Sequence, residues 1–181
     1  MANRAYLYGM EGKQVTGISE YNYDVPIAYK ILLSQNTKMV KSRIFTNPFK
    51  IALQGNFEKG VERLYSFLEE LKTKGYFEEN ELEEAIADTK AFLQENSNCE
   101  YFYLDCGEIY DMSAAPLYLS NVKMFQKIKN VDKEIKLFYK EMDEMKKEYE
   151  VKKQGQIKED MMNKIGIREW SEYLFYEIAE K

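Results

Sequence analysis

Three carboxylates that lie close together in the sequence are the best candidates for chemistry. Asp105, Glu108 and Asp111 come at the end of a β-prone segment, residues 101–106, or soon after it. Hard cations take oxygen ligands of this kind, and a pair of carboxylates can perform acid–base catalysis. The spacing matches no calcium-binding loop, however, and acidic residues at a strand end also form turns and cap helices. One hypothesis is therefore a metal- or carboxylate-dependent enzyme, and the alternative is a purely structural role.

The rest of the chain offers little catalytic machinery. It contains no histidine, which excludes Ser-His-Asp and Cys-His catalysis and every zinc site with nitrogen ligands. Its two cysteines, Cys99 and Cys106, cannot complete a thiolate zinc site or hold an iron–sulfur cluster. Residues 9–13 follow a strand, but their glycine spacing is wrong for a phosphate loop. We therefore expect no cofactor, no metal and no catalytic residues, and the sequence favours a protein that is not an enzyme.

Charge is unevenly distributed along the chain. The formal net charge is −5, which argues against nucleic-acid binding because phosphates require a basic surface. Residues 58–111 carry 15 acidic and 5 basic side chains, whereas residues 1–57 carry 3 acidic and 7 basic ones. The acidic segment is either a solvated helix surface or a docking surface for a basic partner protein. The carboxylates that we expect on such a docking surface are Glu78, Glu79, Glu83 and Glu84.

Tyrosine is abundant, with 15 residues. Alternation along a strand places Tyr6 and Tyr8 on one face, and it does the same for Tyr101 and Tyr103 on theirs. These rings either pack half-buried under helices or form an aromatic recognition surface, since tyrosine is enriched at interfaces. The partner-binding candidates that come from the aromatic segments are Tyr21, Tyr23 and Asp24.

The periodicity predicts an α/β (α+β) fold in which helices cover a small sheet of three or four strands. Extended segments are expected at 3–8, 18–24, 42–45, 49–53 and 101–106. A helix is expected to begin at Pro26, and a second is expected after Asn56, which is a favourable N-cap. A third helix is expected to begin with a capping box formed by Asn80 and Glu83. Cys106 is expected to be a buried free thiol.

The last third of the sequence is helical in pattern. A seam over residues 131–149 repeats apolar residues with heptad spacing; its members are Val131, Ile135, Phe138, Met142, Met145 and Tyr149. A final helix is expected over 167–179, with Ile167, Trp170, Leu174 and Ile178 on one face. We expect the two to form a helical hairpin within one chain, which favours a monomer over a homodimer joined by the seam. Residues 113–181 would then extend a 1–112 core within one domain, 1–181.

Four segments, residues 1–8, 18–27, 51–57 and 103–111, resemble an uncharacterised bacterial family of domain-of-unknown-function type. The resemblance covers about the first 112 residues and implies a bacterial cytoplasmic protein, but it brings no activity or site residue. No signal peptide or membrane span is expected. The acidic character is similar to that of immunity proteins, which neutralise toxins. The leading hypothesis is a non-enzymatic, immunity- or antitoxin-like module that binds a basic protein and neither nucleic acid nor membrane.

Overall fold

The computed structural model describes residues 2–178, and its centre is one antiparallel sheet. The strands are β1 (Arg4–Glu11), β2 (Gln14–Asn22), β3 (Lys38–Val40), β4 (Ala52–Asn56) and β5 (Tyr101–Asp105). Their spatial order is β2-β1-β5-β4-β3, so the last strand in the sequence is the central strand of the sheet. The expected α/β class is confirmed, although the sheet has five strands and not three or four.

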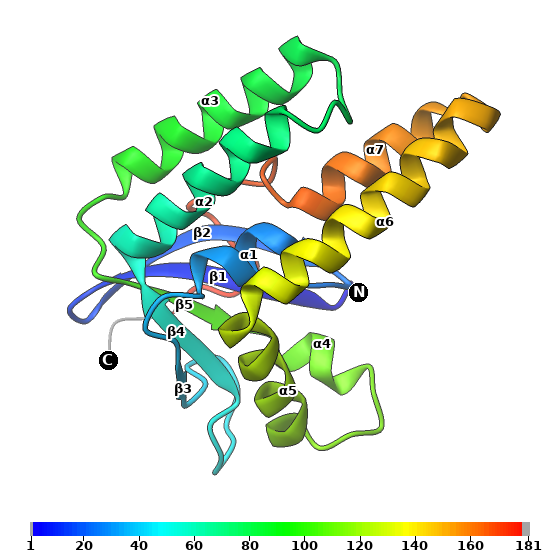
Figure 1. Cartoon of the computed structure of the whole chain (residues 1–181). Coiled ribbons are helices and arrows are strands. Elements are labelled where there is room, and N and C mark those ends of the chain that lie inside the picture. Colours follow the sequence, from blue (N-terminus) through cyan, green and yellow to red (C-terminus); the bar gives the residue numbers. More distant parts are fainter. Residues whose placement is uncertain (1, 179–181) are drawn as a thin grey trace.

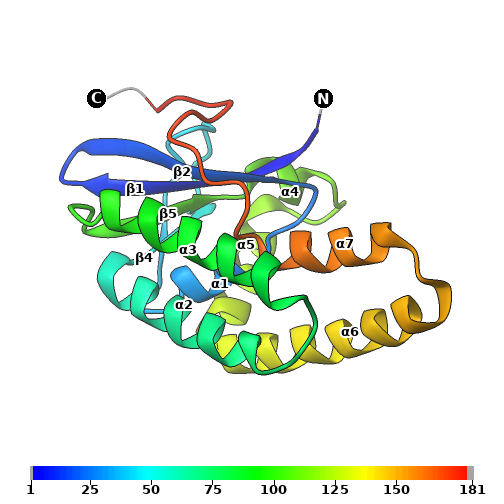
Figure 2. The same ribbon diagram turned by 90° about the horizontal axis from the view of Figure 1, so that it is seen from above.

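Seven helices accompany the sheet in the described residues. They are α1 (Ile27–Leu32), α2 (Phe57–Lys72), α3 (Glu79–Glu95), α4 (Gly107–Asp111), α5 (Leu117–Lys129), α6 (Val131–Lys152) and α7 (Gly155–Ile165). Figures 1 and 2 show α1, α2, α3, α6 and α7 on one side of the sheet. The C-terminal segment, drawn in red, crosses the opposite side in Figure 2. Within residues 2–178, no helix combines the length and apolarity required to cross a bilayer.

Alternation along β1 divides its side chains between the two faces of the sheet, as expected. Ala5 and Leu7 belong to the core under the helices, whereas Tyr6 and Tyr8 belong to a second cluster on the opposite face. The same division holds in β5, where Phe102 and Leu104 face the helices. The free thiol of Cys106 is buried in that core, as expected.

The helix boundaries are partly those that the sequence predicts. Asn56 caps α2, because its side-chain oxygen accepts a hydrogen bond from the Lys59 amide at 2.9 Å. The predicted capping box of α3 is wrong, since the helix begins at Glu79 and Asn80 lies inside its first turn. Buried Tyr76 donates a hydrogen bond to Asp143 at 2.7 Å. This contact joins the chain just before α3 to α6.

The segment between α1 and β4 also differs from the prediction. Residues 42–45 form a loop and not a strand, and the short edge strand is β3, a few residues earlier. Ser42 explains the difference, because its hydroxyl accepts hydrogen bonds from the amides of Ile44 and Phe45 at 3.1 and 2.8 Å. A side chain that closes a tight turn on its own backbone prevents the extended conformation that a strand needs.

The predicted helical hairpin exists, but its second arm is α7 and not a helix over 167–179. Lys153, in the left-handed conformation, ends α6 and reverses the chain. Val131, Phe138 and Met142 of the seam are buried within the chain. Residues 167–178 contain no helix, and Ala179 lies outside the described residues.

The physical reason is the direction of two apolar side chains in that segment, Trp170 and Leu174. Trp170 stacks on Phe92 of α3, with ring centroids 5.9 Å apart, and donates its indole N–H to Thr89 at 2.9 Å. Leu174 belongs instead to the cluster on the opposite face of the sheet. A helix would place these two residues on one side, so the spacing imitates a helical stripe by coincidence.

We predict that Met142→Ala will lower the free energy of unfolding by about 2–5 kcal/mol, because its fully buried side chain leaves a cavity. Leu137 lies on the same helix and is 52% exposed, so Leu137→Ala is the matched control and should change stability by less than about 0.5 kcal/mol. Urea unfolding of both variants measures the difference. Equal costs would show that the seam is not packed as described.

Candidate functional site

The sheet face that points away from the helices, here called the tyrosine face, consists mainly of Tyr6, Tyr8, Met10, Ala52 and Tyr103. Tyr8 and Tyr103 are paired across β1 and β5, and their ring centroids are 5.9 Å apart. Burial raises the pKa of both phenols well above the usual value, so their hydroxyls remain protonated donors.

The tyrosine face is covered by an extended segment, residues 167–178, which we call the tail (Figure 2). On the tyrosine face, Leu174 is buried with 8% exposure, and Tyr176 meets the Tyr6 ring edge-to-face at 5.2 Å. The neighbouring side chains point outward, since Tyr173 is 83% and Phe175 52% exposed. The tail therefore alternates as a strand does, although it pairs with β2 only at Trp170.

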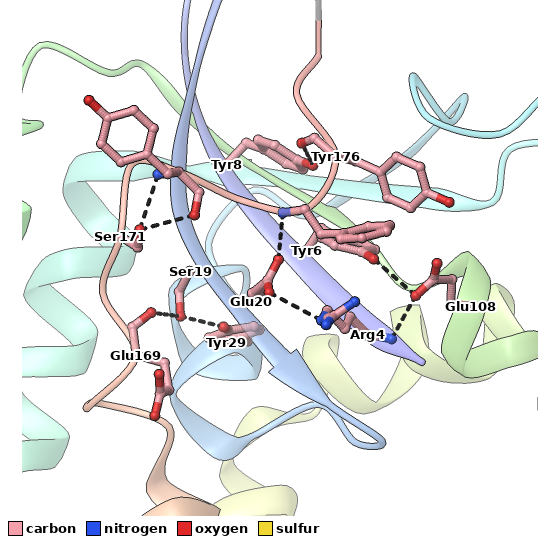
Figure 3. A network of polar contacts seen from close by, with 12 residues as sticks. Arg4, Tyr6, Tyr8, Ser19, Glu20, Tyr29, Glu108, Glu169, Ser171 and Tyr176 are labelled. Atoms are coloured by element: carbon pink, nitrogen blue, oxygen red, sulfur yellow. Dashed lines mark hydrogen bonds and ion pairs between the residues drawn. The ribbon is translucent and has the colours of Figure 1, made fainter. Parts of the chain in front are cut away.

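Groups of the sheet bind the main chain of the tail in its second half (Figure 3). The Tyr8 hydroxyl donates to the Tyr176 carbonyl at 2.8 Å, and the Phe175 amide donates to the Glu20 carboxylate at 2.8 Å. Neither contact involves a tail side chain. Another sequence with the same backbone path could make both of them.

The first half of the tail is fastened at the edge of β2 in the same way. The Ser171 amide donates to the Ile18 carbonyl at 3.0 Å. The Ser19 hydroxyl donates to the Glu169 carbonyl at 2.6 Å and accepts from the buried Tyr29 hydroxyl at 2.5 Å, as Figure 3 shows. This relay connects α1, the edge strand and the tail through buried polar groups, whose loss would be costly.

Two glycines permit the path of the tail. Gly166 has a φ of +80°, which a side chain would strain, and it ends α7 where the tail begins. At Gly17 of β2, a Cβ atom would collide with the carbonyl of Glu172. The close approach of two backbones is therefore possible only because position 17 has no side chain.

One end of the tyrosine face carries a charged network (Figure 3). The Arg4 guanidinium forms an ion pair with Glu20 at 3.1 Å and lies 4.8 Å from the centroid of the Phe175 ring. Glu108 accepts hydrogen bonds from the Arg4 amide and the Tyr6 hydroxyl, both at 2.9 Å. Glu108 is therefore occupied in fastening α4 to the start of β1.

Asp105 is fully buried on the same face and accepts three hydrogen bonds. Its donors are the Ser42 hydroxyl at 2.5 Å, the Tyr103 hydroxyl at 2.9 Å and the Gly107 amide at 3.0 Å. Burial raises the pKa of this carboxyl, and the three donors only partly offset the effect. Its contact with Ser42 holds the 41–50 loop against the sheet.

The three carboxylates of the enzyme hypothesis thus lie in different environments. Asp105 is buried beneath a loop, Glu108 bonds to β1, and Asp111 is exposed at the end of α4. Among residues 2–178, no three His, Cys, Asp or Glu side chains are placed to hold a metal ion.

The four glutamates singled out in the sequence lie together on α3 and the residue before it. Glu78, Glu79, Glu83 and Glu84 are all exposed, and none of them forms an ion pair with another described residue. Glu81, on the same helix, differs because it pairs with Arg168 of the tail at 2.7 Å. The helix therefore presents a group of carboxylates without an ion pair among the described residues, although Glu79 and Glu83 are close enough to act on the charge of Lys72.

The other three candidates lie apart, at the end of β2 and just beyond it. Tyr21 is not free for recognition, because its hydroxyl donates to the Asn163 carbonyl of α7 at 2.6 Å and burial raises its pKa to about 12. Tyr23 is 60% exposed, and Asp24 is exposed with its carboxylate on the Val25 amide at 2.7 Å. These residues and the α3 glutamates belong to different elements.

The sequence reasoning missed the tail as a cover for the tyrosine face. A signal for it was present in residues 173–176, where Tyr, Leu, Phe and Tyr allow period-two alternation. The exposed fractions of Tyr173 and Leu174, 83% and 8%, show that alternation directly. The helical spacing of the flanking apolar residues obscured this shorter period.

The chain belongs to a family described as a domain of unknown function, DUF7822, which matches residues 5–145. The uncharacterised family that the four segments indicated is thereby confirmed. No curated protein and no solved structure matches the chain. The match runs from β1 into α6, so it contains the tyrosine face but neither α7 nor the tail.

We predict that Asp105→Asn will alter the pH dependence of stability. The pKa of the Asp105 carboxyl is higher in the folded than in the unfolded state, so protonation of this carboxyl favours folding. This contribution to stability is lost as the pH rises from the unfolded-state pKa, about 3.9, through the folded-state pKa. The stability of the variant relative to wild type should therefore improve as the pH rises above about 4. Urea unfolding across this range, with Asp111→Asn as control for the lost charge, measures it. A constant difference would contradict the raised pKa.

We predict that Gly17→Ala will loosen the tail. The added methyl collides with the Glu172 carbonyl, which should cost about 1–3 kcal/mol and speed hydrogen exchange at the amides of Ser171 and Phe175. Gly155→Ala is the matched control, because a Cβ there meets nothing within 4 Å. Hydrogen exchange by mass spectrometry compares the two. Similar protection of the tail in both would contradict the close approach.

Proposed function

We propose that this protein is a non-enzymatic protein-binding module that docks a basic partner on the exposed carboxylates of α3. The observation that supports the proposal is the group Glu78, Glu79, Glu83 and Glu84, all exposed and without ion pairs in the described residues. Carboxylates held at fixed positions on a helix attract and orient a basic surface at longer range than neutral groups can.

The distribution of charge supports the same proposal. On α2, Glu69 and Glu70 are balanced by lysines at 3.0 to 3.6 Å. The acidic side chains on α2 thus have lysine partners among the described residues. The glutamates at the beginning of α3 form no such ion pairs. Solubility alone does not require such a gathering of one sign, because mixed charges solubilise equally well.

We further propose that the module is immunity- or antitoxin-like and acts in the bacterial cytoplasm. This setting rests on the resemblance of the four sequence segments and on the similarity of an acidic surface to toxin-neutralising proteins. Cys99 and Cys106, which are buried and free, are typical of a reducing compartment.

We predict that Glu83→Lys/Glu84→Lys will slow association with the basic partner roughly tenfold at low ionic strength, because the steering charge is reversed. Raising salt should weaken wild-type binding, since the screening length is about 8 Å at physiological ionic strength. The experiment is a cross-linked pull-down from the host with a tagged chain, followed by association kinetics with the purified partner.

Glu144→Lys/Glu150→Lys on α6 is the matched control, because both residues are exposed and the change in net charge is the same. It should leave association close to that of wild type. Recovery of no basic protein before or after cross-linking, or equal effects of the two double variants, would contradict the proposal.

A further inference from the structure

We propose that the tyrosine face is a binding site for an extended peptide segment of a partner protein, and that the chain's own tail is its resting occupant. This site is independent of the acidic surface on α3, so either proposal can fail without the other. The partner segment is one with an apolar residue and then an aromatic residue two positions later, as in Leu174 and Tyr176.

The first argument is the kind of contact that holds the tail. Three amide or carbonyl groups of its main chain, at Ser171, Phe175 and Tyr176, bond to groups of the sheet at 3.0, 2.8 and 2.8 Å. These points lie along six consecutive residues, which span about 20 Å when extended. A small molecule would not reach all of them, whereas any extended chain of the same direction would. Main-chain recognition of this type, with pockets for alternate side chains, is how proteins bind peptides.

The second argument is that the tail fills the site incompletely. A hollow of about 300 Å³ runs along it and is lined by Tyr8, Val15, Gly17 and Leu174. Another of about 460 Å³ lies between Glu177 and Ile178 of the tail and the loop around Arg43. Ligand sites commonly have volumes in this range. A bulkier partner segment would gain contacts that the tail does not make.

The third argument is that the family match contains the residues of the site but not the tail that covers them. Tyr6, Tyr8, Glu20 and Tyr103 lie within the part of the chain that the family matches, and the tail lies outside it. Of the tail's aromatic side chains beyond Trp170, Tyr173 and Phe175 remain 83% and 52% exposed. Beyond Trp170, the tail is held by main-chain bonds, by Leu174 and by the ring contact of Tyr176 with Tyr6. Residues 171–178 are therefore suited to local release while Trp170 stays on α3, because few buried apolar contacts are lost.

The test uses the full chain and a fluorescein-labelled peptide with the sequence of residues 168–178. Wild type should bind it weakly, because its own tail competes. Leu174→Asp removes the tail's anchor and leaves the site intact, so its apparent Kd should be at least about tenfold tighter. Tyr173→Asp, one position away and outward-facing, is the matched control and should behave as wild type. Fluorescence anisotropy measures each Kd.

Two further variants test whether the peptide binds to the tyrosine face. Gly17→Ala in the Leu174→Asp chain should abolish binding, because the methyl blocks the peptide backbone as it blocks the tail. The same peptide with aspartate at the position of Leu174 should not bind. Failure of the peptide to bind a folded Leu174→Asp chain, or binding that is unaffected by Gly17→Ala, would overturn the proposal.

Hydrogen exchange on the wild-type chain keeps the proposal testable if Leu174→Asp does not fold. The amides of Ser171 and Phe175 should exchange much faster than those of β1, since the tail opens without global unfolding. Exchange at the same rate as the core would overturn the proposal. A concentration-dependent dimer of wild type, seen by light scattering and lost in Tyr176→Ala, would show that the occupant is a second copy and would overturn the assignment to another protein.

Discussion

The insertion of β5 between β1 and β4 is the interaction on which the rest of the structure depends. It pairs with both strands in antiparallel register, for example Leu104 with Leu7 on one side and with Leu53 on the other. Without it, the N-terminal hairpin and the β3–β4 pair would be two separate two-stranded units, which are marginal in water. Its alternation also sends Phe102 into the helical core and Tyr103 to the opposite face. One strand therefore defines both layers of the protein.

A sheet with two buried faces needs two covers, and this chain builds them differently. The face under the helices is closed by long apolar side chains such as Leu64 and Leu68 of α2, in the manner of any core. The tyrosine face is closed by an extended strap whose backbone bonds to groups of the sheet, as the Tyr176 carbonyl does to the Tyr8 hydroxyl. The first cover is held mainly by shape and apolar area, and the second mainly by directional bonds. The second is consequently the more separable of the two.

The sequence predicts correctly those elements in which the apolar period and the end signals indicate the same structure. Examples are the alternation of β1 and the Asn56 cap of α2. The prediction fails where one pattern has two explanations. The spacing of Trp170 and Leu174 fits a helix, yet one ring stacks on α3 and the other side chain enters the tyrosine face, because the chain passes around the edge of β2. The candidate site could not be predicted without this path, because its contact between Glu20 and Phe175 joins residues 155 positions apart in the sequence. No local pattern carries such a contact, whereas the exposed α3 carboxylates could be located from the sequence alone.

The tail is made after the sheet during synthesis, because it follows β5 in the sequence. The five strands end at residue 105 and the tail begins at 167, so the sheet and the helices that precede α6 can assemble before the strap is synthesised. At about 5–20 residues per second, this interval lasts several seconds. During it the nascent chain displays Tyr6, Tyr8 and Tyr103 to whatever is nearby. The peptide segment proposed above would therefore meet the open form of a newly made molecule before the chain can close upon itself.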